Sequence, residues 1–138
     1  MGKSIRELMT SNPRSSQADK PVIEAAKIMR DDDVGLVPIV EGDRLVGTLT
    51  DRDIAIRLVA EGKDPASTPV KDVASRDLVT VDPDQDLDEA LRLMAQHQVR
   101  RLPVVEEDGK LVGVVAQADV ARQSDDKKTG EVVERISK

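Results

Sequence analysis

The amino-acid sequence predicts an α+β fold in which a strand-helix-strand-strand-helix unit occurs twice and forms two packed small sheets. Three observations support this prediction. The chain contains an internal repeat, part of each copy has apolar residues at three- and four-residue spacing, and each copy has two β-branched runs separated by turn residues. At 138 residues, the chain is long enough to bury a core in one domain or in two interdependent units.

The repeat becomes visible when residues 24–57 are aligned with residues 89–122. The alignment pairs Glu24 with Glu89, Ala25 with Ala90, Met29 with Met94, Val34 with Val99 and Pro38 with Pro103 and, after one extra residue in the second turn, Leu45-Val46-Gly47 with Leu111-Val112-Gly113. It extends back from residues 5–8 to residues 70–73. We therefore predict a first repeat at residues 1–66, a second repeat at residues 67–123 and a polar tail at residues 124–138.

A short strand and an amphipathic helix are expected to open each copy. The apolar segment at 78–82 predicts the strand in the second copy, and the weaker segment 14–18 is its counterpart in the first. The helix follows because apolar residues then recur at helical spacing. Asp19 and Asp84 are suitable N-cap residues for these two helices.

A hairpin and a second helix are expected to complete each copy. The runs "LVPIV" and "RLVGTL", and later "LPVVE" and "KLVGVV", are separated by turn residues, which favours a hairpin. Pro38 and Pro103 are expected near a sheet edge or the beginning of a strand, where a missing N–H is tolerated. The second helix of the first copy is expected to end at Gly62, and residues 62–69 form the linker. The tail suits either a frayed end or an arm that packs on a partner subunit.

The composition argues against several classes of function. The formal net charge of −6 makes general binding to nucleic acid or to an anionic membrane surface unfavourable. The chain has no cysteine and a single histidine, so no nucleophile-base pair or metal cluster of familiar spacing can be assembled. We expect no enzyme activity, no metal site and no required cofactor. No apolar run has the length of a signal peptide or a bilayer span, so a cytoplasmic protein is expected.

The stretch "TDRD" at the start of the second helix allows two interpretations. Thr50 followed by Asp53 is typical of a capping box, in which each side chain accepts a hydrogen bond from the other residue's backbone N–H. The same helix start presents free N–H groups and partial positive charge, which suit a phosphate. The second copy keeps Asp119 but has Ala116 in place of the threonine. We therefore expect two unequal sites, with the one at Thr50 and Asp53 the better.

Over residues 4–123 the sequence resembles a tandem pair of cystathionine-β-synthase (CBS) domains. The resemblance rests on "MRDDDVGLVPIV" with "DRLVGTLTDRDI" and on "MAQHQVRRLPVV" with "GKLVGVVAQADV". It implies a regulatory module that binds AMP, ADP, ATP or S-adenosylmethionine in clefts between the two repeats. It also implies a homodimer that acts on a separate effector protein, because no effector domain is attached.

The resemblance implies a role for particular residues. Thr50 would bond a phosphate, and Asp53 and Asp119 would each bind ribose hydroxyls. The adenine would lie against the first strand of each hairpin, at Leu36, Val37, Pro38, Leu102 and Pro103, although an ordinary core strand needs the same apolar residues.

Arg52, Arg100 and Arg101 are candidate phosphate ligands, because arginine presents a fork of donors that suits phosphate; solvated surface arginines are the alternative. A different hypothesis for the whole chain is a ligand-independent structural or interaction protein of a stress response. The loss of a threonine at Ala116 and the net negative charge motivate that hypothesis.

Overall fold

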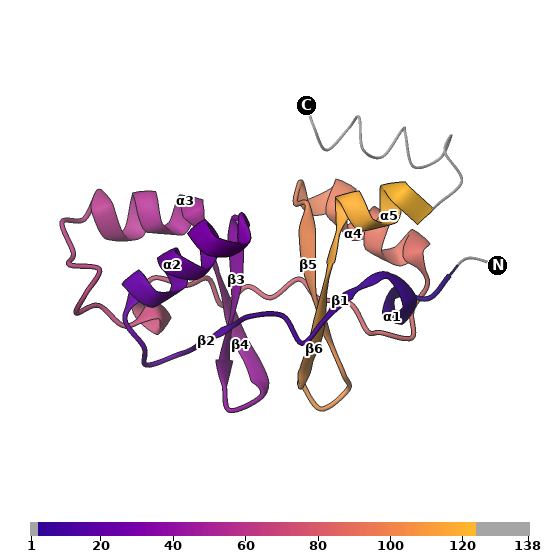
Figure 1. The fold of residues 1–138 in the computed structure, drawn as a ribbon, viewed down its shortest axis with the longest axis horizontal. Helices are drawn as coiled ribbons and strands as arrows, with labels where there is room; N and C mark the ends of the chain where they lie inside the picture. The colour runs from indigo at the N-terminus through magenta and orange to yellow at the C-terminus, as the bar shows by residue number, and fades with distance from the viewer. Residues whose placement is uncertain (1–2, 124–138) are drawn as a thin grey trace. The chain divides into compact units, whose positions relative to one another are not determined.

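The computed structural model describes residues 3–123. The chain forms two compact units: unit 1 consists of Met1–Pro13 and Val79–Lys138, and unit 2 of Arg14–Leu78. Each unit contains one three-stranded sheet with helices packed on it (Figure 1). This arrangement confirms the predicted α+β class and the duplication. None of the helices in the described part of the chain combines the length and the apolar character that crossing a bilayer requires.

Unit 2 contains the helices and hairpin of the first repeat. Its elements are β2 (Ser16–Gln17), α2 (Val22–Asp32), β3 (Leu36–Glu41), β4 (Arg44–Thr50), α3 (Asp51–Asp53), a π-helix η1 (Ile54–Val59) and a 3₁₀ turn η2 (Val70–Asp72). The strand order is β2-β3-β4, with β2 parallel and β4 antiparallel to β3. The predicted hairpin is therefore present, and Gly42 adopts the positive φ of its turn.

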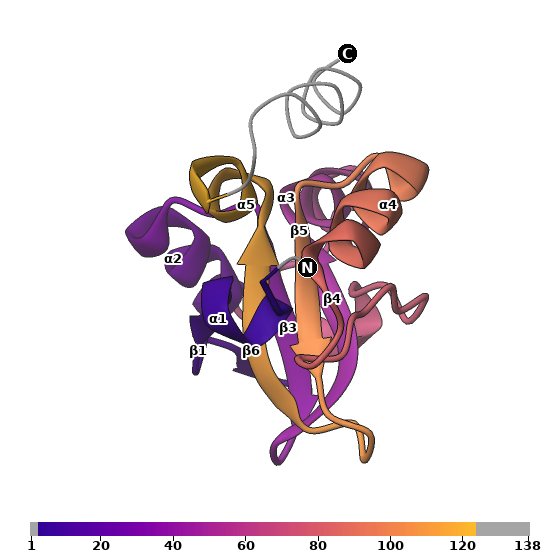
Figure 2. The same cartoon turned by 90° about the vertical axis from the view of Figure 1, so that its right-hand side faces the viewer.

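Unit 1 contains the helices and hairpin of the second copy, but its third strand pairs with the second strand of the hairpin and not with the first. Its elements are α1 (Ile5–Leu8), β1 (Thr10–Ser11), α4 (Leu87–His97), β5 (Arg101–Val105), β6 (Leu111–Ala116) and α5 (Gln117–Gln123). The strand order is β1-β6-β5, and all pairs are antiparallel. Figure 2 shows α1 beside β6.

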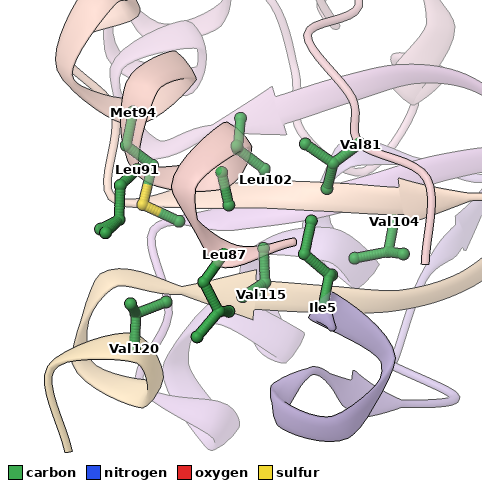
Figure 3. Close-up of a cluster of buried hydrophobic side chains, with 10 residues drawn as sticks. Ile5, Val81, Leu87, Leu91, Met94, Leu102, Val104, Val115 and Val120 are labelled. Carbon is green, nitrogen blue, oxygen red and sulfur yellow. The ribbon is translucent and has the colours of Figure 1, made fainter. Parts of the chain in front are cut away.

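The opening segment of each repeat packs on the hairpin of the other repeat. Ile5, from the first repeat, is fully buried in the core of unit 1 with residues of the second repeat such as Leu102 and Val115 (Figure 3). In the same way Val70, from the second repeat, is buried in the core of unit 2 with Val22 and other first-repeat residues. The repeats have exchanged their first helical turns.

The packing units consequently divide the chain at other places than the repeats do. The predicted boundary between residues 66 and 67 separates the two copies of the sequence repeat. The compact units change over at Pro13/Arg14 and at Leu78/Val79. A repeat read from the sequence is thus not the piece of chain that packs as one core.

The predicted N-caps at Asp19 and Asp84 are wrong. Helix α2 begins after Pro21, and the backbone N–H groups of Val22 and Ile23 donate to the carbonyl oxygens of Thr68 and Pro65 at 2.9 and 3.0 Å. These carbonyls occupy the donors that a capping side chain would otherwise take.

In the second copy the cap lies two residues beyond the prediction. Helix α4 is capped by Asp86, whose carboxylate accepts the Glu89 N–H at 3.4 Å. The N–H of Leu87 donates to the carbonyl of Lys3 at 3.2 Å. Asp84 instead pairs with Arg6 at 3.2 Å on the surface. In both units, therefore, a backbone carbonyl just before the exchanged helical turn accepts a hydrogen bond from the first N–H group of the long helix.

The first strands are shorter than predicted. Only Ser16 and Gln17 of segment 14–18 pair with β3, and in segment 78–82 Val81 alone forms a parallel bridge, to Val104. The proline prediction is confirmed for Pro103, on edge strand β5, but Pro38 lies in the middle strand of its sheet. Pro38 is tolerated because the N–H and C=O of its partner Thr48 bond Ser75 instead, and β2 pairs only with the residues after Pro38.

The second helix of the first copy begins where the sequence predicts but continues as a π-helix. Its wide turns are seen in the bonds from Ala60 N–H to the Ala55 carbonyl and from Lys63 N–H to the Leu58 carbonyl, at 3.0 and 2.9 Å. The π-helix ends at Val59, three residues before the predicted end, and turns continue to Gly62, which has φ +71°. The predicted tail at residues 124–138 lies outside the described residues.

Candidate ligand-binding site

Thr50 and Asp53 form the capping box that their spacing predicts. The Asp53 N–H donates to Thr50 Oγ1 at 3.1 Å, and the Thr50 N–H donates to Asp53 Oδ2 at 2.9 Å. Asp53 is 14% exposed, and its Oδ1 lies 3.9 Å from Arg57 Nε. Within residues 3–123, no acceptor takes the Thr50 hydroxyl proton. The cap therefore leaves this hydroxyl able to donate to a ligand.

The start of strand β3 lies against this helix start. The Asp51 N–H donates to the carbonyl of Gly35 at 3.0 Å, and Leu36 is the register partner of Thr50. A Cβ on Gly35 would lie 3.0 Å from an Asp51 carboxylate oxygen. The absence of a side chain at Gly35 thus lets the Asp51 carboxylate cover the beginning of the strand, and the site carries negative charge there.

The second copy retains half of the capping box. Asp119 Oδ2 accepts the Ala116 N–H at 3.2 Å, and Gln117 N–H donates to the carbonyl of Arg100 at 2.8 Å. The second bond is the counterpart of the one between Asp51 and Gly35. Asp119 therefore has a structural use even without a threonine, because it holds the end of β6 to the start of α5.

A hollow of about 330 Å³ opens beside this second helix start, and it is lined by Arg100, Arg101, Ala116, Gln117, Ala118 and Ala121. Three of these residues are alanines, whose small side chains leave the space, and two are arginines. The side-chain oxygen of Gln117 is buried without a hydrogen-bond partner in the described part of the chain. Gln117 therefore keeps an unsatisfied acceptor at the start of α5, in a residue that lines this hollow.

The two copies differ in charge at equivalent positions. Where the first copy has Gly35 and Asp51, the second has Arg100 and Gln117. The second copy is therefore better suited to a phosphate, because arginine forks form charge-assisted hydrogen bonds with its oxygens. The sequence indicated Arg100 and Arg101 but Gln117 was missed. It could have been found by comparing the copies, because Gln117 replaces the acidic Asp51 at the first residue of the helix.

The apolar candidates divide between two faces of the strands. Val37 and Leu102 are buried in the cores of their units, at 0% and 1% exposure. Leu36, Pro38, Arg101 and Pro103 alternate with them along the strands and therefore face the other side of the sheet. On that side Leu36 and Arg101 are half-buried, and Pro38 and Pro103 are buried. Arg52 is exposed on the first turn of α3. In residues 3–123, His, Asp and Glu side chains form no group of three able to hold a metal ion.

Comparisons with known proteins agree with this architecture. The family model of the CBS domain matches residues 5–60 and 70–126. The CBS domain-containing protein YhcV of Bacillus subtilis is 42% identical over 97% of this chain and 95% of its own length. Hypoxic response protein 1 of Mycobacterium tuberculosis is 39% identical over 86% of this chain and 83% of its own.

Solved structures give the same result. A crystal structure of hypoxic response protein I with two coordinated zinc ions has a TM-score of 0.82 at 38% identity, and covers 89% of this chain and 100% of that one. The crystal structure of CBSX2 in complex with AMP has a TM-score of 0.76 at 26% identity, and covers 88% and 95%. Because both repeats match the family model and full-length relatives align with nearly the whole chain, the protein belongs to the CBS domain family, as a tandem pair of CBS domains.

Proposed function

We propose that this protein is a non-catalytic regulatory module that binds an adenosine-containing ligand and transmits its presence to a separate partner protein. AMP, ADP, ATP and S-adenosylmethionine are the candidate ligands. The CBSX2 structure, with AMP bound to a related CBS pair, supports this class of ligand. A cytoplasmic homodimer that signals to an effector is part of the same proposal.

The observation that carries the proposal is the hollow beside Asp119. Arg100 and Arg101 supply positive charge next to the half capping box, and the buried Gln117 oxygen offers an acceptor. A nucleoside phosphate needs this combination of a cation for the phosphate and acceptors for ribose hydroxyls. The Thr50 and Asp53 site supplies a hydroxyl donor and a carboxylate. We propose that both helix starts bind ligand and that their affinities differ.

The difference in charge gives each site a preference. We propose that Arg100 and Arg101 favour ligands with more phosphate groups in the second copy, which replaces the expectation that the site lacking a threonine is the weaker one for phosphates. The first copy, with Asp51 beside Gly35, favours an adenosine compound with fewer negative charges. For either ligand to regulate a partner, it must bind the two conformations of the protein with different affinity.

The lack of aromatic residues makes the first test simple. Because the chain contains no Phe, Tyr or Trp, the pure protein has almost no near-ultraviolet absorbance, and co-purified adenine nucleotide gives the main band there. Mass spectrometry of the released compound identifies it. Calorimetric titration with AMP, ATP and S-adenosylmethionine then gives the affinities. No heat and no change in melting temperature with any of them would contradict the proposal.

Matched variants separate binding from capping. An asparagine carboxamide still accepts a backbone N–H and is a good N-cap, so Asp53→Asn and Asp119→Asn preserve most of the stability while removing the charge that binds ribose. Thr50→Ser retains the hydroxyl and serves as the control for Thr50→Val. We expect Asp→Asn to weaken ligand binding at its own site with little change in unfolding free energy.

A ligand-independent interaction protein is the second candidate, and one observation favours it. The bonds from Thr50 and Ala116 N–H to Asp53 and Asp119 explain, without a ligand, why both aspartates are present. Partner binding that is the same for the wild type and the Asp53→Asn/Asp119→Asn double variant, with and without nucleotide, would support this alternative.

A further inference from the structure

An open groove of about 640 Å³ lies on unit 2, and Thr50 and Asp53 are not part of its lining. It is lined by Arg57, Lys63, Lys71, Asp72, Ala74, Ser75, Arg76 and Asp77. Four of these residues are cationic and two are acidic, so the groove is locally positive on a chain whose net charge is −6. The cations come from η1, the loop after it, η2 and the segment that follows η2.

Most of these cations have no carboxylate partner. No Asp or Glu among the described residues lies within 4.0 Å of the charged nitrogens of Lys63, Lys71 or Arg76. Arg57 is held in place, since its Nη1 donates to the Val73 carbonyl at 3.4 Å. Placing unpaired like charges around one groove is unfavourable by itself, and an anion in the groove would relieve the repulsion.

A smaller and less open hollow of about 250 Å³ adjoins the groove. Lys71, Ala74 and Arg76 belong to both. The rest of the hollow is mainly apolar, and its complete lining is Ala18, Ile39, Glu41, Val46, Gly47, Lys71, Ala74 and Arg76. An apolar hollow with cations at its rim has the character of a site for a ligand with one apolar and one anionic end.

The wall shared by the two hollows is fixed by backbone contacts. Ser75 and Thr48 exchange two backbone hydrogen bonds, at 2.9 and 3.0 Å. The carbonyl of Ser75 lies 2.9 Å from where a Cβ of Gly47 would be, so only glycine lets this segment approach β4 so closely. Ala74 and Arg76 are therefore held next to β4, and the site exists before any ligand arrives.

We propose that this surface is a second ligand site, separate from the helix starts, that takes a small phosphate ester with a short alkyl group. The phosphate lies between Lys71 and Arg76, where an arginine fork and an ammonium group bond its oxygens. The alkyl group lies over Val46 and Ala74, which are half-buried, whereas Ile39 beneath them is fully buried. The proposal is independent of adenosine binding, because it uses no residue of the two helix starts.

The test uses the full-length protein and n-hexyl phosphate as the probe, with inorganic phosphate as the comparison. Methyl and amide NMR spectra report binding without any aromatic residue. We expect saturable shifts at Val46 and Ala74, and a weaker response to inorganic phosphate. The exposed pair Lys71→Glu/Arg76→Glu is expected to raise the apparent Kd about tenfold or more, since two charged contacts are lost.

The control pair is Lys27→Glu/Lys110→Glu, which makes the same change of charge at exposed positions outside the groove and the hollow. It is expected to leave the Kd within about twofold, because exposed charges at a distance are screened by salt. Equal weakening by both pairs, equal affinity for inorganic and hexyl phosphate, or shifts confined to Thr50 and Asp53 would each overturn the proposal.

Discussion

The exchange of helical turns between the repeats predicts which unit a core substitution will loosen. Ile5 belongs to the first repeat but is fully buried in the core of unit 1, among side chains of the second repeat. We therefore expect Ile5→Ala to destabilise the hairpin of residues 101–116, far along the chain. The hairpin of residues 36–50, which belongs to the same repeat as Ile5, should be much less affected.

The magnitude follows from what the substitution removes. Ile5 has 0% exposure, and alanine lacks three of its buried carbon atoms, each worth about 0.8 kcal/mol of transfer free energy. The cavity left behind adds to this sum, and measured isoleucine-to-alanine changes in cores cost about 2–5 kcal/mol. We expect about 3 kcal/mol, which corresponds to about a 100-fold increase in the equilibrium constant for opening.

Native-state hydrogen exchange followed by mass spectrometry measures this opening segment by segment. Peptides from residues 101–116 should exchange about 100-fold faster in the variant, as the 3 kcal/mol loss requires. Val70→Ala is the reciprocal change and removes two buried carbon atoms from unit 2, so peptides from residues 36–50 should respond to a loss of about 1.6 kcal/mol. Ile23→Ala, at a site 37% exposed, is the control for a change of apolar volume outside the cores.

Two results would refute this role of Ile5: Ile5→Ala accelerates exchange in residues 36–50 as much as in residues 101–116, or it leaves exchange in residues 101–116 unchanged. The first result would mean that the two units open as one, and the second that Ile5 does not support the second-repeat hairpin. A response in unit 1 alone, with the reciprocal response to Val70→Ala, is the expected pattern.

Three further predictions concern local structure. Asp86→Ala should cost about 1 kcal/mol of unfolding free energy because it removes the cap of α4. Asp84→Ala, at an exposed ion pair, should change the unfolding free energy by no more than about 0.5 kcal/mol. Urea denaturation of the two variants measures the difference. The hydrogen bond that Glu89 accepts from Arg92 lowers the pKa of Glu89. The Glu89 carboxylate therefore stabilises the fold above the usual glutamate pKa of about 4.3. This stabilisation is lost as the pH falls through the lowered pKa of the folded state. Glu89→Gln should then make acid unfolding less steep in that window, and an unchanged acid transition would contradict the assignment. Gly113→Ala and Gly47→Ala should each cost about 1–3 kcal/mol of unfolding free energy by overpacking. A second substitution, Met9→Ala, should recover part of this loss for Gly113→Ala, because the Met9 side chain lies against Gly113. It should not help Gly47→Ala, because the group against Gly47 is the backbone carbonyl of Ser75.

Local sequence patterns predicted the elements whose causes are local. The hairpins follow from β-branched runs around turn residues, and the capping box follows from Thr50 and Asp53 at their fixed spacing. The duplication was visible because the same pattern occurs twice. The assignment of the chain to a CBS pair rested on these features and is confirmed by the family match.

Features with distant causes could not be predicted in this way. Asp19 seemed a cap because it precedes a helix, yet carbonyls of Pro65 and Thr68, in the linker at residues 62–69, accept from the first N–H groups of that helix. The packing of Ile5 on the second repeat leaves no local trace, since an apolar turn has the same pattern whichever hairpin it covers. The hollow beside Asp119 needs Arg100 and Gln117 together. The register of β5 with β6, which pairs Arg101 with Ala116, and the bond from Gln117 N–H to the Arg100 carbonyl make them neighbours.

The exchanged turns also bear on how a duplicated chain of this kind holds together. A single repeat carries a helical turn that packs on the hairpin of the other copy. As a separate molecule, one repeat would therefore complete its core only by associating with a second molecule. Its stability would then fall on dilution. Joining two repeats makes that association intramolecular. The linker then sets an effective concentration in the range of millimolar for short flexible linkers, and the fold no longer depends on how much protein is present.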